Sequence, residues 1–91
     1  MSVTIKLPTP LRRHAGQAKS VQVDAGTAGQ ALQALVEQFP AMRGSLYRED
    51  GSIKPFVRVF VGAADIADQQ GGETPVRDGD VISIVPPVAG A

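Results

Sequence analysis

The chain has 91 residues, with nine Lys and Arg against nine Asp and Glu, 43% hydrophobic residues and no cysteine. This length accommodates one domain and leaves little room for a deep substrate cavity. The lack of cysteine excludes disulfides, thiolate nucleophiles and iron–sulfur clusters, and the balanced charge gives no general attraction to nucleic acid or to a membrane surface. Because residues 1–6 carry no apolar leader and no segment reaches membrane-spanning length, we expect a cytoplasmic protein.

The first part of the chain predicts two strands. Apolar and polar residues alternate over residues 3–7, the period of a half-buried strand, until the prolines at positions 8 and 10 end the pattern. A polar stretch at residues 12–17 separates this run from a second alternating run at residues 21–23. Two strands joined by a loop of this length predict an antiparallel hairpin.

Residues 28–39 carry the clearest helix pattern. Thr27 and Gln30 have the spacing of a capping box, in which each side chain satisfies a free backbone N–H. Apolar residues then recur at helical spacing and form one stripe: Ala28, Ala31, Leu32, Leu35, Val36 and Phe39. Pro40 ends the helix, and Gly29 weakens its first turn slightly.

The second half of the chain adds strands but no comparable helix pattern. Residues 41–55 are predicted to be a polar connection from which Leu46 and Tyr47 contact the core. Apolar residues alternate over residues 57–61 and predict a strand that Gly62 closes.

A turn and a strand complete the predicted domain. Ile66 belongs to a short segment, residues 71–72 mark a loop, and the turn at residues 78–80 precedes a last strand at residues 81–85. A helix with one apolar stripe can cover one face of a mixed sheet of four or five strands. The pattern therefore predicts the α+β class.

The last six residues form a tail after this domain: Pro86, Pro87, Val88, Ala89, Gly90 and Ala91. We predict a domain at residues 1–85 and a flexible tail at residues 86–91, which reaches on the order of 20 Å if extended. The two prolines favour an extended start, and the small residues that follow suit a narrow tunnel in a partner. A glycine near the end lets the backbone approach a reacting centre closely.

Two segments carry a resemblance to a known family. Gly79-Asp80, an apolar strand and then Pro86-Pro87-Val88-Ala89-Gly90 resemble the C-terminus of MoaD/ThiS-type sulfur carriers, which include the small subunit of molybdopterin synthase. Leu7-Pro8-Thr9-Pro10-Leu11-Arg12, followed by His14 and Lys19-Ser20-Val21, is similar to the carrier of an alternative cysteine-biosynthesis route. The resemblance implies a β-grasp, ubiquitin-like fold with the first and last strands parallel at its centre.

The resemblance also implies a chemistry. In this family an E1-like enzyme uses ATP to adenylate the C-terminal carboxylate, and sulfide or a relayed persulfide sulfur then displaces AMP to leave a thiocarboxylate. The carrier itself is a cosubstrate, not an enzyme, and binds no cofactor. The implied sulfur acceptor is either a pyridoxal-phosphate-dependent cysteine synthase, with a metalloprotease that trims the product from the tail, or the large subunit of molybdopterin synthase. The longer match favours the cysteine route slightly.

Ala91 departs from the family pattern, which ends in Gly-Gly. Three explanations are open: a natural terminus used by a matched activating enzyme, a substitution that blocks activation, or a chain whose further residues were removed or never made. The first is favoured because small volume changes are often tolerated. If the alanine blocks activation, a ubiquitin-like binding module or protein modifier that carries no sulfur becomes the better hypothesis.

Other residues are weaker candidates for a role. If Phe60 and Val85 face away from the helix, they can form an apolar docking patch for partner enzymes, although ordinary core positions are as good an interpretation. His14 beside two arginines suggests an anion site or a base, but a lone loop histidine is more often solvated. The carboxylates at residues 78 and 80 flank a glycine and are expected to form a turn, and residues 71–72 lack the context of a phosphate loop.

Overall fold

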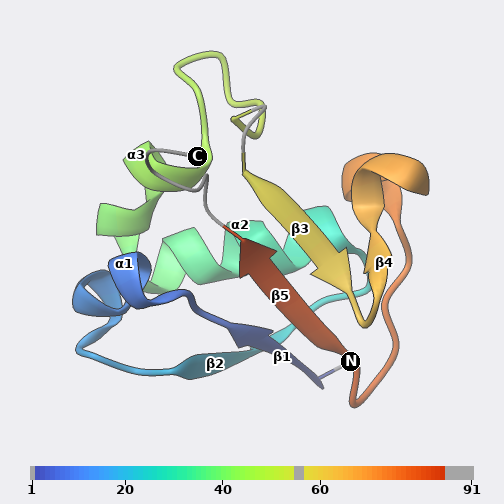
Figure 1. Cartoon of the computed structure of the whole chain (residues 1–91), viewed down its shortest axis with the longest axis horizontal. Helices are drawn as coiled ribbons and strands as arrows, with labels where there is room; N and C mark the ends of the chain where they lie inside the picture. Colours follow the sequence, from blue (N-terminus) through green and yellow to red (C-terminus); the bar gives the residue numbers. More distant parts are fainter. Residues whose placement is uncertain (1, 55–56, 86–91) are drawn as a thin grey trace.

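The structure is a computed structural model that describes residues 2–54 and 57–85. Figure 1 shows these residues as a sheet with helices packed beside it. The strands are β1 (Ser2–Lys6), β2 (Ser20–Asp24), β3 (Arg58–Val61), β4 (Ala64–Asp65) and β5 (Val81–Val85). The helices are α1 (Thr9–Arg12), α2 (Ala28–Gln38) and α3 (Arg43–Leu46), with short 3-10 turns η1 (Arg13–Ala15), η2 (Pro40–Met42), η3 (Ile66–Asp68) and η4 (Gly71–Glu73).

The sheet has five strands in the order β2-β1-β5-β3-β4. β1 and β2 form the predicted antiparallel hairpin, and β1 pairs in parallel with β5, where Ile5 lies opposite Ile82. The β3 strand is antiparallel to both β5 and β4. This mixed sheet, with its first and last strands parallel and adjacent, is the expected β-grasp arrangement (Figure 1).

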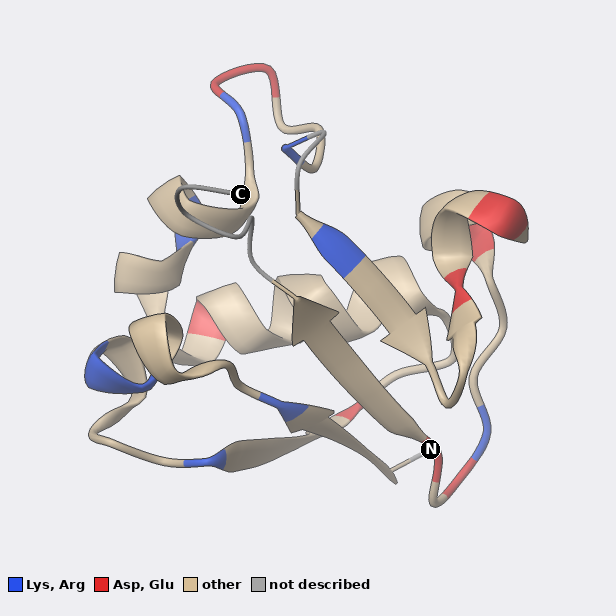
Figure 2. Ribbon diagram, in the orientation of Figure 1, with Lys and Arg blue, Asp and Glu red and all other residues tan. Residues whose placement is uncertain are grey.

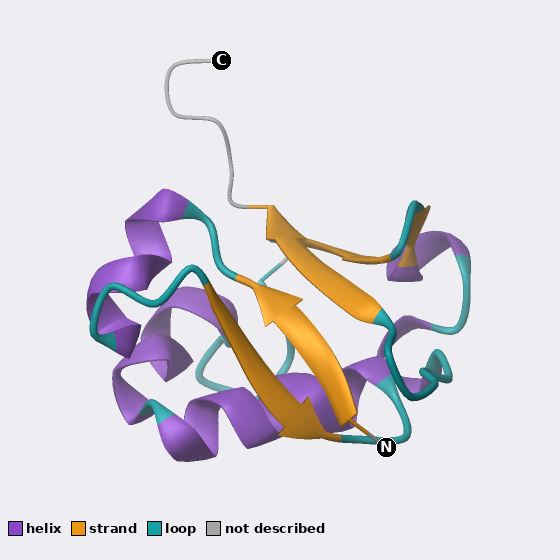
Figure 3. Ribbon diagram, turned by 90° about the horizontal axis from the view of Figure 1, so that it is seen from below, coloured by secondary structure: helices purple, strands orange, loops and turns teal. Residues whose placement is uncertain are grey.

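One face of the sheet packs against α2 (Figure 3). Alternate strand residues on this face are buried, including Ile5 and Ile82, which are 0% exposed. The α2 stripe meets them: Ala28, Ala31, Leu32, Leu35 and Val36 are buried. The two sequence periods, 2 along the strands and 3.6 along the helix, therefore place their apolar residues in one shared core.

The N-terminus of α2 is capped by side chains. The Thr27 hydroxyl accepts a hydrogen bond from the Gln30 N–H at 3.2 Å, as the spacing predicts. The Gln30 side chain accepts the N–H of Gly26 at 2.9 Å, one residue before the position that an ideal capping box would use. The helix ends at Gln38, and Phe39 is its C-cap.

The polar stretch predicted at residues 12–17 is in fact largely helical. Pro10 lies in the first turn of α1, where its missing N–H costs nothing. Leu11 and Ala15 are both buried and are four residues apart, so they share one helical face. Gly16 ends the turn with φ of 64°, a left-handed conformation that glycine adopts readily.

The connection predicted at residues 41–55 is also more ordered than a polar loop. Its first part forms η2 and α3, and Met42 and Leu46, again four residues apart, are 0% and 1% exposed. The prediction for Leu46 is confirmed, whereas the buried Met42 was missed. Tyr47 is half-buried and pairs with Ile53 in an antiparallel bridge.

Candidate functional site

The end of β5 positions the start of the predicted tail. Val85 is the last residue of this strand and lies opposite Arg58, the first residue of β3. The tail residues proposed to carry function, Pro86, Pro87, Val88, Ala89, Gly90 and Ala91, lie outside the described residues. The chain therefore leaves the domain at a defined place, the edge of the sheet where β1 and β5 end and β3 begins.

Phe60 and Val85 share the face of the sheet that is opposite α2. Strand pairing places Val59 opposite Ile84, and both are buried on the α2 side. Their chain neighbours Phe60 and Val85 consequently point the other way, where Phe60 is half-buried and Val85 is 39% exposed. Because Phe60 lies opposite Ser83, it is diagonal to Val85, a relation of roughly 7–8 Å between sheet positions.

The rest of this outer face is largely polar. On β1 it carries Thr4 and Lys6, which lie opposite Val81 and Ser83 of β5. Farther out, β2 presents residues such as Gln22, which is exposed. On this face Val85, next to the start of the tail, is an exposed large hydrophobic side chain, whereas Phe60 and Val81 are half-buried.

An ion pair stabilises the neighbouring edge. The Arg58 guanidinium lies 3.5 Å from the Asp65 carboxylate, with the arginine side chain 69% exposed and the aspartate side chain 12% exposed. The same carboxylate accepts the N–H of Ala67 at 2.9 Å. The ion pair connects β3 to β4 beside Phe60 and leaves most of the guanidinium in solvent, whereas the bond from Ala67 caps η3.

The weaker candidates from the sequence are two turn aspartates and a loop histidine. Asp80 accepts the N–H of Arg77 at 2.8 Å and closes the turn as expected, whereas Asp78, in the same turn, accepts the N–H of Ser2 at 2.9 Å and links the turn to β1. His14 lies half-buried in η1, and a function for it stays a hypothesis. Within residues 2–54 and 57–85, no three His, Asp or Glu side chains gather as a metal site.

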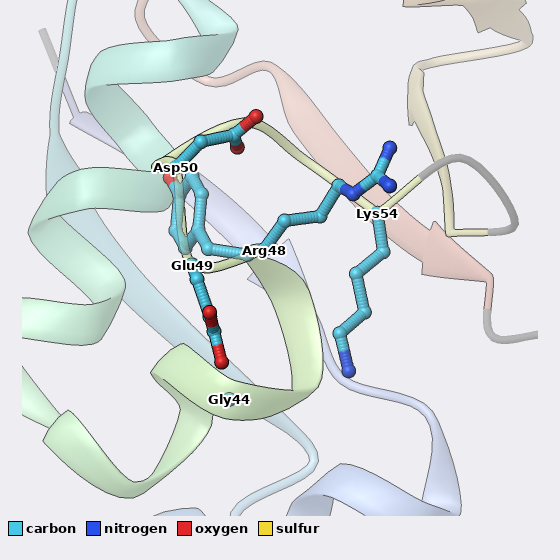
Figure 4. A pocket seen from close by; sticks show the side chains of 6 residues that line it. Gly44, Arg48, Glu49, Asp50 and Lys54 are labelled. Carbon is cyan, nitrogen blue, oxygen red and sulfur yellow. The ribbon is translucent and has the colours of Figure 1, made fainter.

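A hollow of about 650 Å³ lies beside α3. Its lining includes Arg48, Glu49, Asp50 and Lys54, whose charged ends point in different directions rather than toward a common centre (Figure 4). The Ser52 hydroxyl donates a hydrogen bond to the Asp50 carboxylate at 2.6 Å. This bond, together with one from the Ser52 N–H, lowers the pKa of the Asp50 carboxyl. Divergent solvated charges do not assemble a reaction centre, so this hollow is not the candidate site.

The sequence of this chain matches one protein family over nearly its whole length. The model of the ThiS family matches residues 5–90, which includes both the domain and most of the tail. The chain belongs to the ThiS family. The resemblance drawn from its two ends is thereby confirmed.

Two relatives of this ThiS-family protein have sequences similar over most of their length. Sulfur carrier protein CysO from Mycobacterium tuberculosis is 34% identical over 92 aligned residues, covering 99% of each chain. Small archaeal modifier protein 3 from Haloferax volcanii is 37% identical over 67 residues, covering 74% of this chain and 72% of the relative.

A solved structure agrees with the fold of this ThiS-family protein. The crystal structure of the Amycolatopsis orientalis BexX/CysO complex contains a chain with a TM-score of 0.89 and 32% identity, and the match covers 98% of this chain and 99% of the other. The β-grasp prediction is confirmed by this similarity. None of the described helices is long and apolar enough to cross a membrane.

Proposed function

We propose that this ThiS-family protein is a sulfur carrier whose C-terminal carboxylate is converted to a thiocarboxylate. In the first step the carboxylate oxygen attacks the α-phosphorus of ATP on an E1-like enzyme, which forms an acyl adenylate and releases pyrophosphate. In the second step hydrogen sulfide attacks the acyl carbon and expels AMP, leaving the thiocarboxylate and a proton. The ATP is bound by the partner, and the carrier is a protein substrate, not a catalyst.

The observation that carries this proposal is the match to the CysO sulfur carrier along 99% of both chains. A match of this extent includes the domain and the tail together, so it concerns the whole carrier and not only a common fold. The family model, which matches residues 5–90, reaches Gly90 of the tail as well.

The described geometry supports the same role physically. A carboxylate is a poor electrophile, and its activation needs a partner that supplies ATP chemistry. What this domain contributes is a paired support: β1 pairs with β5 as far as Ser83, and β3 pairs with it as far as Val85, the residue before the tail. Phe60 and Val85 beside that exit supply apolar surface for docking.

The acceptor that we favour is a pyridoxal-phosphate-dependent cysteine synthase. The CysO relative and the similarity at residues 7–21 both support this branch over molybdopterin synthesis. The synthase would join the amino acid to the tail, and a metalloprotease would release the product. In the other branch, the large subunit of molybdopterin synthase would take the sulfur.

The proposal is tested by weighing the intact protein. The chain is incubated with the E1-like enzyme of its own organism, ATP and sulfide, and with the same mixture lacking ATP. We expect a mass gain that equals exchange of one oxygen for one sulfur, in the complete reaction only, and fragmentation places it in the last residue. An unchanged mass in the complete reaction, while the enzyme converts a proven carrier, would contradict the proposal.

A second candidate function is protein modification. It is favoured by the similarity to small archaeal modifier protein 3. The same acyl adenylate would then react with a lysine ε-amine, forming an amide and releasing AMP. Covalent adducts of this chain on other proteins, formed with ATP but without sulfide, would support this function, and their absence alongside thiocarboxylate formation would support the carrier.

A further inference from the structure

The chain has no formal net charge, but the fold places several basic residues together at one edge of the domain. Lys6 ends β1, Lys19 precedes β2 and Arg58 begins β3, so all three lie at the edge where β5 ends. The connection from β1 to β2 adds Arg12 and Arg13 at the same edge. We refer to these five residues as the basic edge.

Six of the nine acidic residues lie in two groups away from the basic edge, and the other three are Glu37 in α2 and Glu49 and Asp50 in the loop between α3 and β3. Asp24, Asp78 and Asp80 lie at the opposite edge, together with Arg77. A further group on the β4 side consists of Asp65, Asp68 and Glu73. Five basic and no acidic residues give the basic edge a formal charge of +5, whereas three acidic residues and one basic residue give the opposite edge −2. Figure 2 shows this difference between the two ends of the strands, and it also shows acidic residues in the loop between α3 and β3, on the same side as the start of β3.

Four cations of the basic edge are exposed to a partner, whereas Arg12 is half-buried and its Nε donates a hydrogen bond to the Leu7 carbonyl at 3.2 Å. Lys6, Arg13 and Lys19 are exposed, and in the part of the chain that the structure describes none of them forms an ion pair. Arg58 keeps 69% of its side chain exposed despite its contact with Asp65. From β2 to β3 the edge spans three strand spacings, about 15 Å, so its charges act together at low ionic strength.

We propose that the basic edge docks on an acidic surface around the opening through which the activating enzyme receives the tail. This inference rests on the proposed function, since it concerns how that enzyme recognises the carrier. β5 ends within the basic edge, with Lys6 opposite Ser83 on one side and Arg58 opposite Val85 on the other. A protein that takes residues after Val85 into a channel therefore approaches Lys6 and Arg58 first. If the rim of that channel is acidic, it attracts the correct end of the carrier and repels the acidic end.

A protein partner fits this surface better than a nucleic acid. A nucleic acid is an extended polyanion, so it would also meet the acidic groups at the opposite edge and on the β4 side and be repelled there. The chain as a whole has no net charge to offset this repulsion. A local acidic rim meets only the near edge. The exposed Val85 and the half-buried Phe60 next to the basic edge supply the apolar contact that is typical of the centre of a protein interface.

The predicted consequence is electrostatic steering of association. The test measures association and dissociation rates with the E1-like enzyme of the same organism at ionic strengths from about 0.02 M to about 0.5 M. Lys19→Glu is compared with Arg77→Glu, since both residues are exposed and both substitutions change the net charge by the same amount. Lys19→Arg, which keeps the charge, controls for the substitution itself, and each variant is checked for wild-type unfolding behaviour.

We expect Lys19→Glu to slow association about fivefold at low ionic strength and Arg77→Glu to change it less than twofold, with the difference lost at high ionic strength. Equal slowing by both variants, or a wild-type rate that does not depend on salt, would overturn the inference. A wild-type chain that binds with this salt dependence but forms no thiocarboxylate would overturn the proposed function and leave the docking surface supported. Salt-sensitive binding of a 20-nucleotide RNA that Lys19→Glu removes, without such an effect on the enzyme, would assign the surface to nucleic acid.

Discussion

At the scale of single residues, Gly29 has a role that its sequence context conceals. A β-carbon on Gly29 would lie 2.9 Å from the carbonyl oxygen and 3.3 Å from the Cα atom of Gly72. These are backbone atoms of η4, so they do not move aside as the end of a flexible side chain would. Helix propensity alone predicts that alanine is better here, whereas the contact between α2 and η4 requires glycine.

We therefore predict that Gly29→Ala lowers the free energy of unfolding by about 1–3 kcal/mol, because the added methyl group forces two packed segments apart. Gly44 in α3 is the matched control, since its β-carbon would meet nothing within 4 Å. Gly44→Ala should raise the free energy of unfolding by about 0.5–1 kcal/mol. Urea denaturation measures both, and stabilisation by Gly29→Ala would show that the contact with η4 is not restrictive.

Ala91 is predicted to lie at the limit of what the activating enzyme accepts. If the tail enters a narrow tunnel, Ala91→Val adds two methyl groups beside the reacting carbon, which costs about 1–3 kcal/mol. The rate of thiocarboxylate formation should then fall by about tenfold or more. Ala91→Gly should be converted at least as fast as the wild-type chain, and a wild-type rate for the valine variant would argue against a close-fitting tunnel.

At the scale of elements, periodicity predicted the regular segments and missed the short ones. α2 carries a stripe of apolar residues at helical spacing, and β5 is a short apolar run directly after a turn, so the positions of both were evident. In contrast, α1 and α3 have four residues each, and a helical period is not visible in so short a window. The signals that could have found them are the pairs of apolar residues four apart, Leu11 with Ala15 and Met42 with Leu46, whose burial confirms the helical spacing.

The outer face of β5 carries Val85, which we propose contacts the activating enzyme. Val85→Ser removes exposed apolar area at that face, and we expect the KM for the activating enzyme to rise roughly fivefold, corresponding to about 1 kcal/mol. Gln22→Ser is the control, because Gln22 is exposed on β2, two strands away on the same sheet. Steady-state kinetics give the comparison, and the free energy of unfolding should change by less than about 0.5 kcal/mol in both variants. Equal KM values for the two variants would remove Val85 from the docking surface.

At the scale of the whole molecule, the division into a domain at residues 1–85 and a tail at residues 86–91 remains a prediction. Among the described residues the core is complete up to Ile84, with Ile82 and Ile84 of β5 buried. Deletion of residues 86–91 should therefore change the free energy of unfolding by less than about 0.5 kcal/mol, while thiocarboxylate formation is abolished. Deletion of residues 82–91, which removes the strand between β1 and β3, should unfold the domain. Circular dichroism and intact mass measure the two effects, and a strongly destabilised 1–85 chain would show that the tail is part of the fold.

The sequence by itself determined the α+β class, α2 with its cap, and β5 leading to the tail, because each depends on periods and turn residues within one short stretch. The resemblance carried by the two ends supplied the family and the strand order. Only the tertiary structure decided which distant residues meet. The separation of charge is the clearest case. Composition gives nine charges of each sign and predicts no directional attraction, and the hairpin places Lys6 beside Lys19, but only the pairing of β5 with both β1 and β3 brings Arg58 to the same edge. Strand pairing joins residues far apart in the chain, so neither composition nor local pattern could reveal which edge they share.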